Sequence, residues 1–261
     1  MPRETVFMSE MTWPDFAARM AADPVVLLPV GATEQHAHHM PLGVDQLIPT
    51  AICRLVAERI GGLVAPPIPY GYKSQPKSGG GQHFPGTLSL DAGTLIAVVR
   101  DVIRELARHG VRRIAVLSGH YENGWFVIEA IDLALREAAR DGITGLRVIR
   151  LDYWDFISKA SEAMLFDGES PNWPLEHAAI METSVMMHLH PWLVDAAAIV
   201  DHPPAEFPPY DLYPVDRGPI PPDGALSSPK PASADKGRRV VEQIVPDIAA
   251  ALTRGFGPAS A

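Results

Sequence analysis

Six consecutive apolar residues, Val25-Val26-Leu27-Leu28-Pro29-Val30, are followed directly by Gly31. A short run of this kind, β-branched at both ends, is typical of a strand that is covered on both faces of a parallel sheet. The chain from Leu47 to Ile60 then carries apolar residues at helical spacing, and Gly61 ends it. This part of the chain therefore predicts a strand followed by an amphipathic helix.

The alternation of strand and helix patterns continues along the chain. Strand patterns recur over residues 63–68, 114–118 and 147–151, and helix patterns over residues 94–109, 126–140 and 234–252. Such alternation favours parallel pairing of the strands through right-handed crossovers. We therefore expect an α/β fold with a mainly parallel sheet, formed by one domain over residues 1–261, although the length also permits two small domains.

The composition is that of an ordinary globular enzyme, with 47% hydrophobic and 20% charged residues. A formal net charge of −9, without a run of Lys or Arg, argues against a nucleic-acid partner. No apolar stretch approaches the ~20 residues that span a bilayer, and the N-terminus lacks the apolar region of a secretory signal. Cys53 is the single cysteine, which excludes an intrachain disulfide and a sulfur-rich zinc site. We therefore expect a cytoplasmic protein with no nucleic-acid or membrane partner.

Residues 203–231 are dense in proline and include three Pro-Pro pairs. Such a segment cannot form a helix or a central strand. A disordered linker is one interpretation, but Phe207, Tyr210 and Tyr213 are unusual in a solvated linker. We expect an ordered, extended segment that packs on the body of the protein or on a neighbouring subunit.

Carboxylate and imidazole groups follow two of the predicted strands. Glu34 and His36 come after the first strand, and their spacing of two places both side chains on the same face of an extended segment. His120 and Glu122 repeat this spacing after the strand over 114–118, and Asp45 precedes a helix. In parallel sheets, ligands bind beyond the carboxyl ends of the strands, which is where these residues fall.

These two imidazoles and three carboxylates are ligands that suit Zn²⁺ or Mn²⁺. One ion would need three or four of them. Five are better explained by two ions roughly 3.5–4 Å apart that share one bridging carboxylate, for which Asp45 is the best candidate. Taken singly, each residue could instead be a polar group of a surface loop.

A long glycine-rich loop, residues 74–87, lacks the spacing of a phosphate-binding loop, and no dinucleotide-binding glycine motif occurs. We expect this loop to form one wall of a small-molecule site, because glycines let the backbone approach a ligand closely. Trp154 and Trp173 could hold a flat polar ring by stacking, or could pack in the core. His177, beside acidic and aromatic residues, could transfer protons or could be a structural histidine.

Several stretches of the sequence resemble the creatininase family of creatinine amidohydrolases. They are Val30-Gly31-Ala32-Thr33-Glu34-Gln35-His36, Val44-Asp45, Gly71-Tyr72-Lys73-Ser74-Gln75, His83-Phe84-Pro85-Gly86-Thr87, Gly119-His120-Tyr121-Glu122-Asn123 and Phe207-Pro208-Pro209-Tyr210-Asp211. The Glu-x-His motif marks only the wider superfamily. The Tyr-Glu after His120, the paired tryptophans and the late proline segment are more specific, and they resemble the creatininases themselves. The resemblance covers the whole chain. It implies an α/β sandwich with a mainly parallel sheet flanked by helices, assembled as a homohexamer.

The resemblance also implies two divalent metal ions per subunit, zinc or manganese. Glu34, Asp45 and His120 would hold one ion. His36, Asp45 and Glu122 would hold the other, so that Asp45 is shared. Glu122 would also be a second candidate for handling protons, if its bond to the metal is labile.

On the substrate side, the resemblance implies contacts from Ser78, Tyr121 and Trp173, with Trp154 lining the pocket. It makes His177 the proton shuttle and a substrate contact. The implied reaction is the reversible opening of the cyclic amide of creatinine to give creatine. Hydroxide formed at the metals would attack the ring carbonyl.

Three departures from the family pattern lie on the substrate side. Pro174 stands where an acidic residue is expected after the second tryptophan, and Ala178 stands where a glycine is expected after the histidine. The loop before Trp173 is shorter by a residue. They leave open a related hydrolase that acts on another small lactam or a formamide. A non-catalytic scaffold subunit is a further possibility, against which the complete set of metal ligands argues.

Overall fold

The computed structural model describes residues 4–169 and 172–257. Over these residues the chain forms a sheet in the order β2-β1-β3-β4, and neighbouring strands run parallel. The strands are β1 (Val25–Val30), β2 (Leu63–Val64), β3 (Arg113–Ser118) and β4 (Arg147–Asp152). The parallel sheet expected from the alternating pattern is therefore confirmed.

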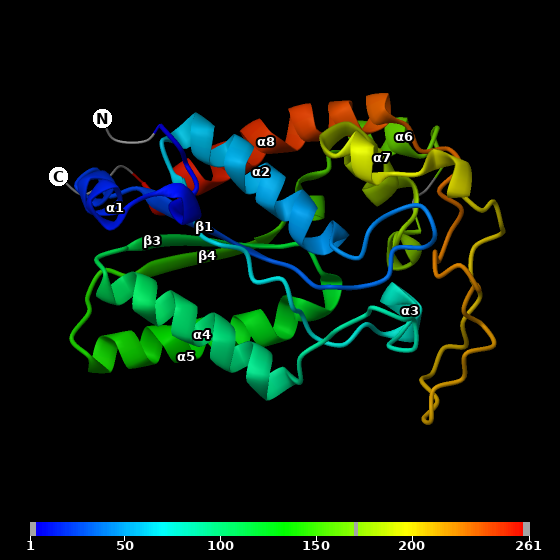
Figure 1. Cartoon of the computed structure of the whole chain (residues 1–261), viewed down its shortest axis with the longest axis horizontal. Helices are drawn as coiled ribbons and strands as arrows, with labels where there is room; N and C mark the ends of the chain where they lie inside the picture. Colours follow the sequence, from blue (N-terminus) through cyan, green and yellow to red (C-terminus); the bar gives the residue numbers. More distant parts are fainter. Residues whose placement is uncertain (1–3, 170–171, 258–261) are drawn as a thin grey trace.

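Helices cover both faces of this sheet (Figure 1). α2 (Val44–Ile60) and α8 (Ala234–Phe256) lie on one face, and α4 (Ala92–Arg108) and α5 (Gly124–Arg140) lie on the other. All four were predicted from the spacing of apolar residues, and each ends within four residues of the expected position. The α/β sandwich is confirmed.

Side chains of β1 and β3 alternate between two buried layers. Leu27 and Ala115 pack in the layer that contains α2 and α8. Val26 and Ile114 pack in the layer that contains α4 and α5. Because helices cover both faces, every residue of β1 is buried, which is the physical reason for its unbroken apolar sequence.

The second strand is shorter than the predicted 63–68. β2 ends at Val64, because Pro66 and Pro67 follow almost at once and have no N–H to donate to a neighbouring strand. Pairing resumes as an isolated bridge between Ile68 and Val30.

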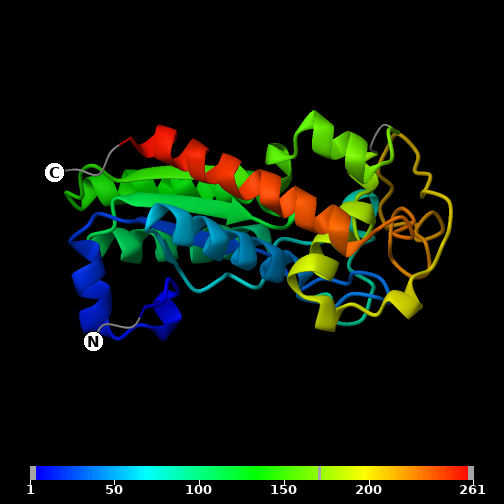
Figure 2. The same cartoon turned by 90° about the horizontal axis from the view of Figure 1, so that it is seen from above.

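Shorter helices and turns complete the described part of the chain. They are α1 (Trp13–Met20), α3 (Pro76–Gly79), α6 (Lys159–Leu165), α7 (Ile180–Leu189) and the 3₁₀ turns Met8–Glu10, Tyr121–Asn123, Tyr153–Phe156, Trp173–Leu175, Pro191–Leu193 and Ala196–Ala198. Residues 203–231 contain no helix or strand and lie at the end of the molecule away from both termini (Figure 2). Within the described ranges, no helix is long and apolar enough to cross a membrane.

Candidate metal centre

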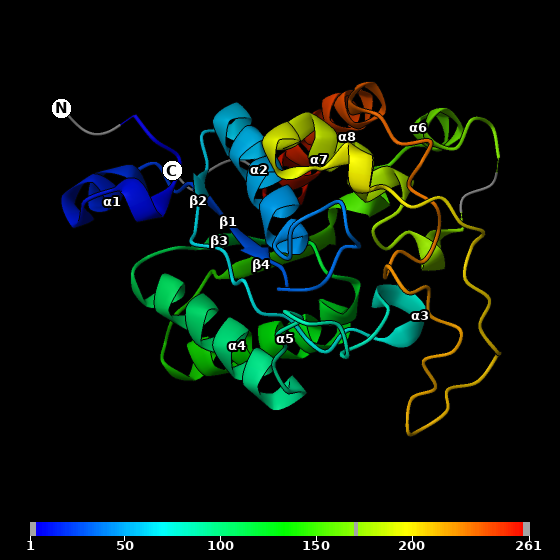
Figure 3. The same cartoon turned by 45° about the vertical axis from the view of Figure 1, so that its right-hand side comes forward.

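The site lies beyond the carboxyl ends of β1 and β3, which pair in register up to Val30 and Ser118. Two glycines follow these positions, and a Cβ on either Gly31 or Gly119 would collide with the backbone carbonyl of Asp45. The glycines therefore let both strand ends approach the first turn of α2, so that Asp45 lies between them. Helices α3 and α7 lie at the same end of the sheet (Figure 3).

One group of candidate ligands consists of Glu34, Asp45 and His120, all of them buried. His120 Nδ1 lies 3.1 Å from Glu34 Oε2 and 3.0 Å from Asp45 Oδ2. His120 Nε2 lies 2.9 Å from the carbonyl oxygen of Tyr72. Because a carbonyl oxygen can only accept, Nε2 carries a proton, and Nδ1 is the nitrogen that can bind a metal.

A second group consists of His36, Asp45 and Glu182. His36 Nε2 lies 3.1 Å from Asp45 Oδ1 and 3.7 Å from Glu182 Oε2. His36 Nδ1 lies 3.1 Å from the backbone carbonyl oxygen of Glu34, to which it donates, and this leaves Nε2 to face the carboxylates. Asp45 presents one carboxylate oxygen to each imidazole, as expected of a bridging ligand.

Glu122 does not lie in this second group, which differs from the expected ligand set. Its Oε2 is 3.4 Å from His120 Nε2, on the side of the ring away from Asp45. Its Oε1 accepts hydrogen bonds from the Gln75 N–H (3.0 Å) and the Ser78 hydroxyl (2.5 Å). These bonds to the glycine-rich loop hold the Glu122 carboxylate near His120 Nε2, on the opposite side of the ring from Asp45.

Glu182 groups with His36 and Asp45, where Glu122 was expected, and sequence reasoning did not single it out. It lies in α7, whose neighbouring residues Met181, Val185 and Met186 are buried and apolar. A single acidic residue in such a helix was the available signal, because a buried carboxylate requires a partner or a metal. Glu182 Oε2 accepts a hydrogen bond from the Ala178 N–H at 2.7 Å.

The electrostatics of the site favour cations. Burial raises the pKa of Glu34 to about 7 and that of Glu182 to about 8. Burial opposes the charged form of His36, but the adjacent Asp45 carboxylate raises its pKa to about 10. Glu34 Oε1 and His36 Nε2 are buried and make no hydrogen bond within the described part of the chain. Buried lone pairs that converge in this way fit two divalent ions with mixed N/O ligands.

The residues expected on the substrate side line one pocket of about 710 Å³, which reaches Glu34, Asp45 and His120. They are Ser78, Tyr121, Trp154, Trp173 and His177. The Trp173 indole N–H donates to Glu162 Oε1 at 3.2 Å, and the ring packs edge-on against Phe166, so it contacts the core as well as the pocket.

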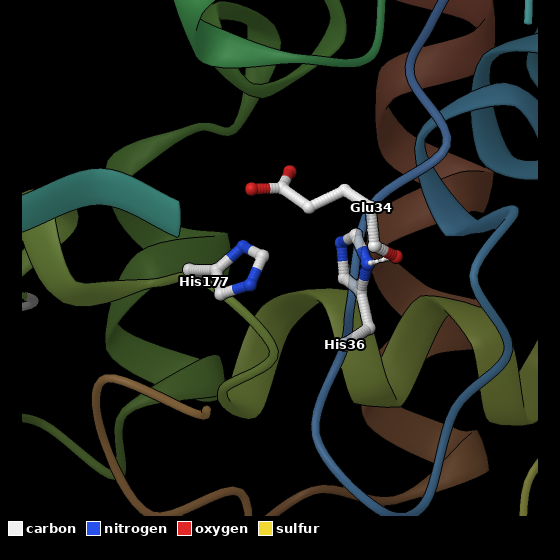
Figure 4. Close-up of side chains that lie close together, drawn as sticks. All are labelled: Glu34, His36 and His177. Atoms are coloured by element: carbon white, nitrogen blue, oxygen red, sulfur yellow. Dashed lines mark hydrogen bonds between the residues drawn. The ribbon is translucent and has the colours of Figure 1, made fainter. Parts of the chain in front are cut away.

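The imidazole of His177 faces the metal ligands (Figure 4). Its ring centroid is 4.6 Å from that of His36, and one of its nitrogens groups with Glu34 and His36. Burial, reinforced by the nearby His36, lowers the pKa of His177 well below the usual value, so the ring is neutral. Its Nε2 lies 2.8 Å from the side-chain nitrogen of Gln35.

The glycine-rich loop contacts the metal ligands directly. A Cβ on Gly79 would collide with Glu34 Oε1 and Ser74 Oγ. The loop backbone therefore lies close against the candidate metal ligand Glu34, and its approach to a small molecule stays a prediction.

Comparison with known proteins gives a consistent result. A family model described as "Creatininase: Creatinine amidohydrolase" matches residues 9–252. The creatinine amidohydrolase of Pseudomonas putida is 54% identical over 257 residues, which are 98% of this chain and 99% of that protein. Three solved structures are similar over 98% of this chain and 100% of their own. They are creatininase with Mn (TM-score 0.95, 54% identity), an E122Q mutant creatininase of Zn-Zn type (0.96, 53%) and an E122Q mutant creatininase complexed with creatine (0.95, 53%).

Proposed function

Because the chain belongs to the creatininase family, we propose that it reversibly hydrolyses the cyclic amide of creatinine to creatine, at a centre of two divalent metal ions. The observation that carries this proposal is the position of Asp45, whose two carboxylate oxygens lie 3.1 Å from His36 Nε2 and 3.0 Å from His120 Nδ1. One carboxylate between two imidazole-containing groups is the arrangement that a two-metal hydrolase needs.

We assign the metal ligands from this geometry. Glu34, Asp45 and His120 would hold one ion, and His36, Asp45 and Glu182 would hold the other. Zinc and manganese both suit these donors, and both occur in the creatininase structures that resemble this chain. When bound, two such ions would lower the pKa of a bound water toward neutrality and would polarise a carbonyl oxygen.

The chain's own residues bind and orient the substrate. Trp154 and Trp173 stand on the pocket wall, where their rings can stack on a flat amide ring. Ser78 and Tyr121 offer hydroxyl groups to its polar edge. Holding the ring carbonyl beside the metal ligands converts the attack of water into a step between positioned groups.

Opening the ring requires a proton on the departing nitrogen, and two side chains that line the pocket are candidates to donate this proton. His177 is neutral and faces the ligands Glu34 and His36. Glu122 lies beside Ser78, with its carboxylate close to His120. Both groups are within the pocket that would hold the substrate.

The alternative substrates, another small lactam or a formamide, rest on Pro174 and Ala178. Ala178 has a φ of 53°, a left-handed conformation that glycine adopts without strain. The backbone here therefore keeps the shape that a glycine would give, and the Ala178 N–H still binds Glu182. Ala178 therefore gives no reason to expect another substrate, and the alternatives rest on Pro174, which lines the pocket.

Purified protein, freed of metal and reloaded with Mn²⁺ or Zn²⁺, tests the proposal against creatinine, creatine, other small lactams and formamides. We expect turnover of creatinine and of creatine, and none by the His120→Ala variant. Turnover of a formamide without turnover of creatinine would replace the proposed substrate. Full activity of the His120→Ala variant would refute the metal centre.

We further propose that the chain assembles as a homohexamer in the cytoplasm. Tyr210, Leu212 and Tyr213 support assembly, since each is more than half exposed on the proline-rich segment. Such apolar side chains are suited to a contact between subunits. Light scattering after size-exclusion chromatography should give six times the mass of the chain, and a monomer would contradict this proposal.

A further inference from the structure

Gln35 lies between the metal ligands Glu34 and His36, and the proposed mechanism does not use it. The residue is 5% exposed. Its side-chain amide connects three separate segments: the glycine-rich loop, the proline-rich segment and the turn that carries His177. A buried amide with this many partners determines how those partners are oriented.

The orientation of the amide follows from its backbone partner. The N–H of Ala37 donates to Gln35 Oε1 at 2.8 Å, and a backbone N–H can only donate. The other terminal atom, Nε2, is therefore the NH₂ group, which donates only. It lies 2.9 Å from the Gly224 carbonyl oxygen, 3.1 Å from the Gly79 carbonyl oxygen and 2.8 Å from His177 Nε2.

Because Gln35 Nε2 donates, the His177 nitrogen beside it must accept this hydrogen bond. His177 Nε2 therefore presents its lone pair to Gln35, and the proton of the neutral ring is on Nδ1. Nδ1 lies on the side of the ring toward the Glu34 carboxylate (Figure 4). In this tautomer the nitrogen that Gln35 does not contact carries a hydrogen, so it offers the pocket a donor and no lone pair.

We propose that Gln35 is a positioning residue that fixes His177 as a hydrogen-bond donor through Nδ1. The inference rests on the proposed function. The Nδ1–H of His177 stabilises negative charge on the reacting group without leaving the ring.

The test reads the tautomer directly, in zinc-loaded protein, which is diamagnetic. Two-bond ¹⁵N–¹H NMR spectra of histidine side chains distinguish a ring protonated at Nδ1 from one protonated at Nε2, with His177→Asn to assign the signals. We expect the Nδ1–H form in the wild type. We expect a mixture or the other form in Gln35→Met, which keeps the length of the side chain but loses the amide.

Kinetics give the second measurement. In Gln35→Met, kcat should fall by about tenfold or more with KM changed little, because the donor acts on charge that develops in the transition state. Metal content should stay at two ions per chain. Gln82→Met is the matched control, since Gln82 is exposed in the glycine-rich loop, and it should match the wild type in both measurements.

An Nε2–H ring in the wild type, or an unchanged Nδ1–H ring in Gln35→Met, would overturn the inference. The spectrum is recorded without substrate, so it does not depend on the proposed reaction. If creatinine is not turned over but the tautomer responds to Gln35, the positioning role stands and the proposed function fails. If creatinine is turned over and the tautomer does not respond, the positioning role fails alone.

Discussion

Replacing Glu182 with glutamine should remove one metal ion from each chain. The variant keeps the shape of the side chain and an oxygen for the Ala178 N–H, but it loses the negative charge that lies 3.7 Å from His36 Nε2. Changes to groups that only support a ligand cost about 10–100-fold in metal affinity. Loss of a direct ligand should therefore cost more than about 100-fold, or about 3 kcal/mol.

Glu122→Gln is the matched comparison, because it also replaces a carboxylate with an amide. Glu122 lies beside His120 Nε2, whereas Glu182 lies beside His36 Nε2. The Glu122 carboxylate is 3.4 Å from His120 Nε2, which already has the Tyr72 carbonyl oxygen at 2.9 Å. We expect no more than about a tenfold loss of metal affinity, together with a large loss of kcat.

Equilibrium dialysis against buffered Zn²⁺, followed by metal analysis, distinguishes the two carboxylates. At a concentration that loads the wild type with two ions, Glu182→Gln should retain one and Glu122→Gln two. The opposite result, an ion lost from Glu122→Gln and two retained by Glu182→Gln, would refute the assignment and restore the ligand set that the family resemblance implied.

Three more perturbations test the surroundings of the site. Gly79→Ala should weaken metal binding by about 10–100-fold in the same dialysis, since its Cβ would displace the Glu34 carboxylate; Gly93→Ala, whose Cβ meets no atom within 4 Å, should not weaken it. Glu176→Gln should stabilise the metal-free protein at pH 8 but hardly at pH 5 in urea unfolding. Burial raises the pKa of Glu176 from 4.5 to about 7, so the wild type loses about 3 kcal/mol as the pH rises between these values. A pH-independent difference would contradict this. Ile52→Ala, at a fully buried position of α2, should lower the free energy of unfolding by about 2–5 kcal/mol without changing metal content.

The strands and helices of the sandwich could be predicted from local patterns, because the faces that an element buries determine where its apolar residues fall along the sequence. The run over β1 is apolar throughout since α2 and α8 cover one face and α4 and α5 the other. The length of β2 was wrong because apolar character was given more weight than the missing N–H groups of Pro66 and Pro67.

The candidate site could be predicted only in part. Glu34, His36, Asp45 and His120 follow strand ends or begin a helix, so the topology alone brings them together. Glu182 comes from a helix far along the chain, and only the packing of that helix shows which atoms it faces. The position of Glu122 could not be read from its spacing to His120, because its hydrogen bonds to the glycine-rich loop decide where the carboxylate lies.

The most direct test measures creatinine hydrolysis while Mn²⁺ is added stepwise to metal-free protein. If Asp45 joins two ions in one working centre, the rate should rise until two equivalents per chain have bound and then stay constant. A rate that is complete at one equivalent, or no hydrolysis at any metal concentration, would contradict the account.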